Sequence, residues 1–136
     1  MRTLGPWVVL GAVAAGASGA VLRWALVRWW HEVLRRWRPG RPPFPVGVLV
    51  ANTLASLGAG MAVSGSHAGD AAWREVAVGG FAGGLSTLST LAVDTVAMWQ
   101  AGQRWAAALN VVSTVGLGIV AAAAGVGGVG MAGIGR

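Results

Sequence analysis

Two pairs of polar residues interrupt otherwise apolar stretches of this sequence. Asn52 and Ser56 lie four residues apart, and Asn110 and Thr114 repeat that spacing, so each pair shares one face of a helix. An asparagine amide carries two N–H donors, and a hydroxyl carries one donor. A row of such groups can replace the water around a small anion without supplying a full charge. The alternative is that each asparagine joins two helices through one interhelical hydrogen bond.

A segment rich in glycine, serine and threonine lies between these two pairs. It reads GGFAGGLSTLSTLAVD from Gly79 to Asp94. Glycine pairs have low helix propensity, and Ser and Thr hydroxyls compete for backbone groups. We therefore expect a helix that is broken near residues 83–88. Irregular backbone at membrane depth occurs where protein buries it or water reaches it, and its freed carbonyl and N–H groups commonly bind ions. The alternative is a kinked helix that serves packing alone.

Asp94 follows the expected break by two helical turns and would lie inside a bilayer. A carboxylate at that depth is costly unless it is paired. We expect Asp94 either to orient the break or to pair with Arg23, which lies within the first apolar stretch. The alternative for Arg23 is a side chain that snorkels toward the membrane surface.

Four apolar stretches must position these groups. They run approximately over residues 6–27, 44–64, 75–99 and 105–126. Each is close to the ~20 residues that a helix needs to cross a ~30 Å hydrocarbon layer. Of the 136 residues, 55% are apolar and 10% are charged, whereas average soluble domains carry about a quarter charged residues. The sequence therefore predicts an all-α membrane protein, with residues 1–136 forming a single four-helix membrane domain.

Short connectors join the four stretches and carry half of the ten arginines. They are the arginine-rich segment 29–43, the Gly/Ser segment 64–70 and the short segment 100–104. An arginine cluster between two apolar stretches is typical of charge that flanks a membrane, so nucleic-acid binding is not favoured. Small residues at four-residue spacing, Gly11, Ala15 and Gly19, are expected to form a helix-packing strip.

The residue types give little support to an enzyme. The chain has no cysteine, its four carboxylates are scattered, and His31 and His67 are expected in different connectors. No spacing suits a nucleophile with its base, or a cluster of metal ligands.

Four segments resemble the motifs of the small four-helix fluoride channels of the Fluc (CrcB) family. GAVLRW at 19–24 resembles Gly-Ala-x-x-Arg-Tyr, and PVGVLVAN at 45–52 resembles Pro-x-Gly-Thr-Leu-x-x-Asn. GFAGGLSTLSTLAVD at 80–94 resembles Gly-Phe-x-Gly-Gly-x-Thr-Thr-Phe-Ser-Thr-Phe-x-x-Glu. ALNVVSTVGLG at 108–118 resembles Ala-x-Tyr-x-x-x-Ser-x-x-x-Gly. The third block is specific, and the order of the other three supports it.

The resemblance implies a fluoride-specific channel that exports cytoplasmic fluoride passively and gives fluoride resistance. It implies an antiparallel, dual-topology dimer in the cell membrane, with a structural sodium ion at the dimer centre. Carried over by position, the backbone carbonyls that bind sodium belong to Gly83 and Ser86, and Arg23 lies near the pore entrance. The fluoride pathway would use hydrogen-bonding side chains from three helices, namely Asn52, Ser89, Thr90, Asn110 and Thr114.

The sequence also departs from the family pattern. Leu88 and Leu91 replace the two phenylalanines whose ring edges face the permeating ion in the family. Leucine has no positively polarised ring edge, so it cannot make that contact. Asn110 replaces the family's tyrosine and Thr114 its serine, and both keep a hydrogen-bonding group.

The arginines are distributed unevenly between the two ends of the expected helices. Four spans place both termini on one side with Arg2, Arg74 and Arg136, against Arg28, Arg35, Arg36, Arg38, Arg41 and Arg104 on the other side. The positive-inside tendency therefore favours one fixed orientation. Since an antiparallel homodimer needs one sequence to insert in both directions, we expect a heterodimer with a homologous subunit of opposite orientation.

Two other functions stay open at the level of sequence. The chain could be a non-conducting or accessory partner subunit of a heterodimeric fluoride channel, which would explain the lost phenylalanines. A small multidrug-type four-helix transporter is the second alternative. That class requires a carboxylate deep in its first helix, and residues 6–27 contain none.

Overall fold

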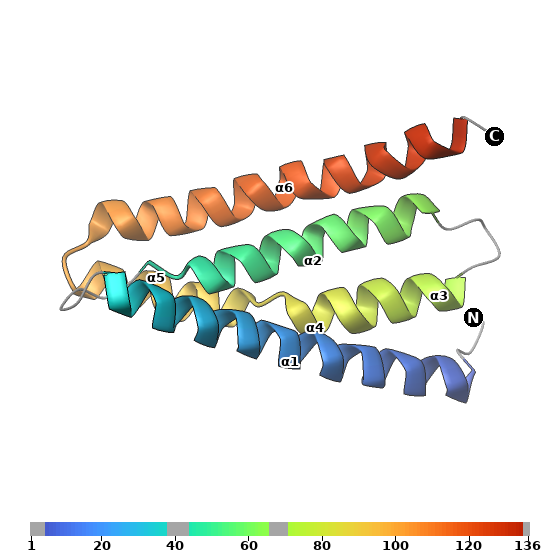
Figure 1. Cartoon of the computed structure of the whole chain (residues 1–136), viewed down its shortest axis with the longest axis horizontal. Helices are drawn as coiled ribbons and strands as arrows, with labels where there is room; N and C mark the ends of the chain where they lie inside the picture. Colours follow the sequence, from blue (N-terminus) through green and yellow to red (C-terminus); the bar gives the residue numbers. More distant parts are fainter. Residues whose placement is uncertain (1–4, 38–43, 66–70, 135–136) are drawn as a thin grey trace.

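The computed structural model describes residues 5–37, 44–65 and 71–134. Every element within these ranges is helical (Figure 1). The elements are α1 (Pro6–Trp37), α2 (Val46–Gly65), α3 (Ala71–Arg74), η1 (Glu75–Ala82), α4 (Gly83–Leu85), α5 (Leu88–Gln100) and α6 (Arg104–Ile134). Helix α1, helix α2, the succession from α3 to α5, and helix α6 are each long and apolar enough to cross a membrane. The predicted all-α, four-span membrane protein is confirmed.

Helix α1 continues ten residues past the predicted end of the first span. It runs to Trp37, so residues 29–37 are helical and not part of a loop, and His31 is an exposed helical residue. The prediction of a loop was wrong because apolar character ends near residue 27, whereas arginine, glutamate and leucine continue a helix well. Glu32 further supports this helix through ion pairs with Arg35 and Arg36, each at 3.1 Å.

Several sequence-based expectations concern residues outside the described ranges. They are the connector at 66–70 with His67, the end of the arginine-rich connector with Arg38 and Arg41, and the terminal residues Arg2 and Arg136.

Helix α1 packs against η1 and α4 with almost no side chains between the backbones. A Cβ atom added at Gly19 would collide with the carbonyl of Phe81, and one added at Gly84 would collide with the carbonyl of Gly16. The expected packing strip of α1 therefore does face the third span.

The third span departs from α-helical geometry over a longer range than predicted. Its η1 segment, Glu75–Ala82, is π-helical, and no sequence pattern predicted this geometry. Helix α4 ends at Leu85, and Ser86 (φ −80°, ψ 155°) and Thr87 (φ −151°, ψ 118°) are extended. Helix α5 then begins at Leu88. We call the two extended residues the 86–87 interruption.

Helix α2 lies between α6 on one side and the third span with α1 on the other (Figure 1). Its buried Ala51 and Ala55 form a small core with Ala82 and Leu85 of the third span. Gly60 of α2 and Gly125 of α6 allow the α2 and α6 backbones to approach each other, since a Cβ at either position would collide with the facing helix. Helix α2 thus presents one face to the 86–87 interruption and another face to α6.

Candidate functional site

The 86–87 interruption is held by a side chain from α2. Asn52 Oδ1 accepts a hydrogen bond from the Thr87 backbone N–H at 2.7 Å, and Asn52 Nδ2 donates to the Thr87 carbonyl at 3.2 Å. Both residues are buried. Only an amide side chain offers an acceptor and a donor in this arrangement. Asn52 therefore satisfies both backbone groups of a buried, extended residue.

This pairing explains which carbonyls lose their helical donors. In an unbroken helix the Thr87 N–H would donate to Gly83 O, but here it donates to Asn52. Similarly, the Thr90 N–H that would donate to Ser86 O donates to the Thr87 hydroxyl at 3.2 Å. Gly83 and Ser86 are the two residues to which the family resemblance assigned the cation-binding carbonyls.

Arg23 of α1 reaches the interruption from the other side. Its Nη1 donates to the Ser86 carbonyl at 3.1 Å. The predicted pairing of Arg23 with Asp94 is wrong, because among the described residues no ion pair joins them. A carbonyl at the end of a helix attracts a cation, and Ser86 O lies within hydrogen-bond distance of Arg23. The Asp94 carboxylate instead faces a cleft between α5 and the end of α1.

A cavity of about 440 Å³ opens beside the interruption, between α2, α5 and α6. Its polar lining comes from Asn52, Ser56, Ser86, Thr87 and Thr114. Its apolar lining includes Leu88, Leu91, Val115, Ile119 and Ala122. The predicted polar faces of the second and fourth spans therefore do meet at one cavity, with Asn52 and Thr114 contributing from opposite sides.

Thr114 carries a buried hydroxyl that has no partner within the described residues. A buried hydroxyl without a hydrogen bond costs about 1–3 kcal/mol, so it is found where a ligand or water completes it. Because Thr114 lines the cavity, its hydroxyl is available to a polar or anionic occupant there.

Asn110 lies deeper than expected and points to a different neighbour. It is fully buried, and its Nδ2 donates to Thr95 Oγ1 of α5 at 2.9 Å. Its Oδ1 atom has no partner within the described part of the chain. Asn110 does not line the cavity beside Asn52. In the single chain it joins α5 to α6, which is the alternative role that the sequence left open for it.

Ser89 and Thr90 belong to a hydroxyl cluster centred on Thr87. The Thr87 hydroxyl donates to Thr90 Oγ1 at 3.0 Å and lies 3.2 Å from Ser89 Oγ. Neither Ser89 nor Thr90 lines the cavity beside Asn52. The Thr87 hydroxyl caps the start of α5 by accepting from the Thr90 backbone N–H, and the Ser89 and Thr90 hydroxyls contact this capping group. Thr87 was the residue missing from the predicted pathway. The Thr-x-x-Thr spacing before an apolar run was the signal for that cap.

The two leucines at the replaced aromatic positions lie in contrasting environments. The side chain of Leu88 is 78% exposed in the single chain, whereas Leu91 is 6% exposed. Both line the cavity. Leu88 therefore lies where a second chain or lipid can reach it, while Leu91 belongs to the packed interior.

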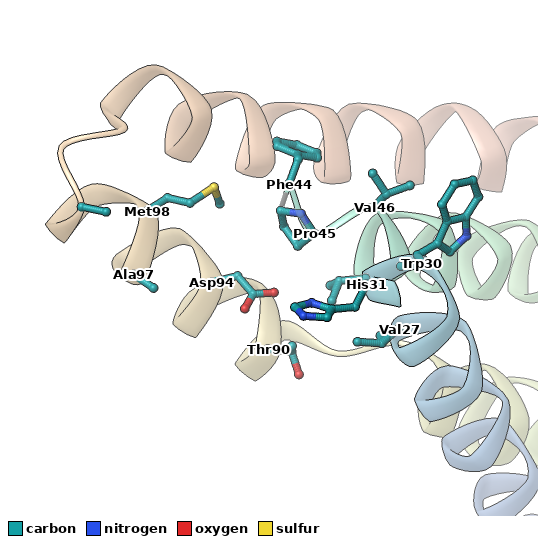
Figure 2. A pocket seen from close by; sticks show the side chains of 13 residues that line it. Val27, Trp30, His31, Phe44, Pro45, Val46, Thr90, Asp94, Ala97 and Met98 are labelled. Carbon is teal, nitrogen blue, oxygen red and sulfur yellow. The ribbon is translucent and has the colours of Figure 1, made fainter. Parts of the chain in front are cut away.

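A second cleft, of about 320 Å³, separates α5 from the end of α1 and the start of α2. Figure 2 shows the Asp94 carboxylate and the His31 imidazole facing one another across it, with Thr90 beside Asp94. Thr90 lines this cleft and not the cavity beside Asn52. Five of the predicted site residues line the cavity beside Asn52, namely Asn52, Ser86, Leu88, Leu91 and Thr114, and Thr90 lines the cleft. The other four, Arg23, Gly83, Ser89 and Asn110, line neither of these two spaces.

Comparison with known proteins places this geometry in a family. Residues 10–126 match the family described as CrcB-like protein, Camphor Resistance (CrcB). A protein named Fluoride-specific ion channel FluC from Cupriavidus taiwanensis is 39% identical over 110 residues, which cover 79% of this chain and 84% of that protein. Fluoride-specific ion channel FluC 1 from Rubrobacter xylanophilus is 38% identical over 113 residues, covering 83% and 86%. The FluC protein of Cupriavidus pinatubonensis is 37% identical over 119 residues, covering 85% and 91%. This chain therefore belongs to the CrcB family of multi-pass membrane proteins.

Proposed function

We propose that this chain is a subunit of a fluoride-specific ion channel that exports cytoplasmic fluoride passively across a bacterial plasma membrane. The relatives named above carry that function in their names. The observation that carries the proposal is the cavity in which the Asn52 amide and the unpartnered Thr114 hydroxyl meet.

Fluoride is small and holds water tightly, so its passage requires hydrogen-bond donors that replace the water it loses. The cavity supplies neutral donors: the second N–H of Asn52, the Ser56 hydroxyl and the Thr114 hydroxyl. Neutral donors stabilise the dehydrated anion without holding it as firmly as an arginine would. Ser89, Thr90 and Asn110 would contribute only where a partner subunit completes the pathway along α5.

The cavity in a single chain is open, which supports a dimer. Leu88, Ser86 and Gly83 are all exposed in the single chain, although they lie at the 86–87 interruption. An exposed interruption at membrane depth needs protein to cover it. We propose an antiparallel arrangement in which a second subunit covers this face. The uneven arginine distribution favours a homologue of opposite orientation as that subunit, and such a partner could supply aromatic rings near Leu88.

The carbonyls at the interruption suit a structural sodium ion. In an unbroken helix the Thr87 N–H would donate to Gly83 O, but here it donates to Asn52. The Thr90 N–H would likewise donate to Ser86 O, but here it donates to the Thr87 hydroxyl. Carbonyl oxygens without helical partners are ligands that hard cations accept. Gly83 and Ser86 of each subunit would hold the ion, which would supply positive charge at the dimer centre. Arg23 already uses one lone pair of Ser86 O, so it would orient that carbonyl.

The test measures fluoride and chloride efflux from liposomes that contain the purified chain alone. A second preparation contains the chain together with a homologous subunit. We expect fluoride efflux that exceeds chloride efflux by orders of magnitude in at least one of the two preparations. Flux that appears only with the homologue supports the heterodimer. Correctly inserted protein that moves no fluoride in either preparation, or that moves chloride equally well, would refute the proposed function.

A further inference from the structure

One end of the molecule gathers arginine and tryptophan on three helices. It consists of Arg28, Trp29, Arg35, Arg36 and Trp37 of α1, Trp99 of α5, and Arg104 and Trp105 of α6. We call this set the basic end. The end of α1 and the turn between α5 and α6 lie together at the same end of the bundle (Figure 1). All eight residues are exposed.

The length of α1 carries part of this end out of the hydrocarbon layer. Its 32 residues span ~48 Å, against ~30 Å of hydrocarbon. The apolar portion, residues 6–27, is already long enough to cross that layer. Residues 28–37 therefore lie at the depth of the lipid headgroups, where tryptophan and arginine are both favoured.

The charges on this extension form one face. Arg28, Glu32, Arg35 and Arg36 follow one another at intervals that keep them on the same side of the helix. Glu32 bridges Arg35 and Arg36, so one carboxylate partly neutralises two guanidinium groups. The Arg28 guanidinium lies 5.6 Å from the ring centre of Trp24, and that of Arg104 lies 5.3 Å from the ring centre of Trp99. These indoles hold the cations close to the membrane surface.

The opposite end of the described structure offers no comparable charge. Arg74 and Glu75 are adjacent there and offset each other, close to the exposed Trp7 and Trp73. Within the described residues, tryptophan is thus present at both ends, whereas arginine outnumbers the carboxylates at the basic end alone.

We propose that the basic end is a binding surface for the phosphate groups of anionic phospholipids. Guanidinium groups bind phosphate oxygens through paired N–H donors, and an anionic membrane surface attracts each arginine by about 1 kcal/mol, or roughly fivefold in binding. This inference is independent of what the cavity conducts.

The structure supplies three substitutions with different expected signs. Replacing both Arg35→Gln and Arg36→Gln removes two cations and should weaken binding of phosphatidylglycerol by more than tenfold. Glu32→Gln removes the carboxylate that competes for those cations, so it should strengthen binding. Arg74→Gln is the matched control, because Arg74 is an equally exposed arginine at the opposite end. A loss of folding alone cannot produce this pattern.

The experiment measures lipids retained by the full-length protein during detergent exchange, by native mass spectrometry, with phosphatidylglycerol and phosphatidylcholine offered in equal amounts. We expect the wild type to retain phosphatidylglycerol preferentially, Glu32→Gln to retain more, and Arg74→Gln to match the wild type. Equal retention of the two lipids, or an equal loss in Arg74→Gln and the double variant, would overturn the proposal. Displacement by millimolar inorganic phosphate would assign the surface to free anions, which also overturns it.

Discussion

Replacing Asn52→Asp tests whether the 86–87 interruption depends on its amide partner. The introduced carboxylate keeps an acceptor for the Thr87 N–H, but it places an oxygen where Nδ2 now donates to the Thr87 carbonyl at 3.2 Å. The variant therefore loses one hydrogen bond and leaves a buried carbonyl facing another oxygen. Leaving that carbonyl unsatisfied costs about 1–3 kcal/mol, and burying an ionised carboxylate adds to this cost.

This destabilisation should lower the melting temperature in detergent by roughly 5–15 °C at neutral pH. Fluoride efflux should be lost as well, because a negative charge would lie in the cavity that we propose as the pathway. At acidic pH the carboxyl becomes protonated and regains a donor for the Thr87 carbonyl. The difference in melting temperature from the wild type should then shrink.

Thr53→Val is the matched control for this experiment. Thr53 is the next residue of α2, and its hydroxyl donates only to Leu49 O of its own helix, at 2.8 Å. We expect this variant to keep both its melting temperature and its fluoride flux. An Asn52→Asp variant with unchanged stability and unchanged flux would refute the assigned role of the amide.

Three further substitutions separate packing from conduction. Gly84→Ala puts a methyl group against the α1 backbone and should abolish the folded peak in size-exclusion chromatography. The methyl group of the control Gly116→Ala would enter open space and should have no effect. A folded Gly84→Ala protein of normal stability would contradict the close packing. Thr114→Val removes a buried hydroxyl that lacks a partner in the described structure, so the melting temperature should stay constant or rise. Fluoride flux should fall at least tenfold, and unchanged flux would exclude Thr114 from the pathway. Leu88→Phe adds a ring at an exposed position and should leave the melting temperature unchanged. Leu91→Phe overpacks a buried position and should destabilise the folded protein by about 1–3 kcal/mol. Equal melting temperatures of the two variants would show that the two positions do not differ.

The sequence was sufficient to predict the four spans, because hydropathy and the thickness of a bilayer determine them almost alone. It was also sufficient to place Asn52 and Thr114 on the polar faces of their helices, since a four-residue spacing fixes the face of each helix, and both residues line the cavity. It could not predict that Asn52 binds the backbone of Thr87. That contact depends on how far α2 is displaced along the third span, which the packing of Ala51 and Ala55 against Ala82 and Leu85 determines.

Two expectations were incorrect, each for a separate reason. Arg23 was expected at Asp94 because opposite charges attract, yet a nearer carbonyl at the end of α4 became its partner. The loop predicted after residue 27 was wrong because hydropathy indicates only which residues suit lipid. The polar residues that follow keep a helical backbone outside the hydrocarbon layer, so α1 continues to Trp37. For Asn110 the sequence predicted the polar face of its helix but not its hydrogen-bond partner, Thr95 of α5.

The two side chains that secure Ser86 and Thr87 both come from earlier parts of the chain. During synthesis, α1 and α2 leave the ribosome and enter the membrane before the third span does. Arg23 and Asn52 are thus already in the bilayer when the extended residues arrive, and the nascent protein need not wait for α6 before it shields those polar backbone groups from lipid.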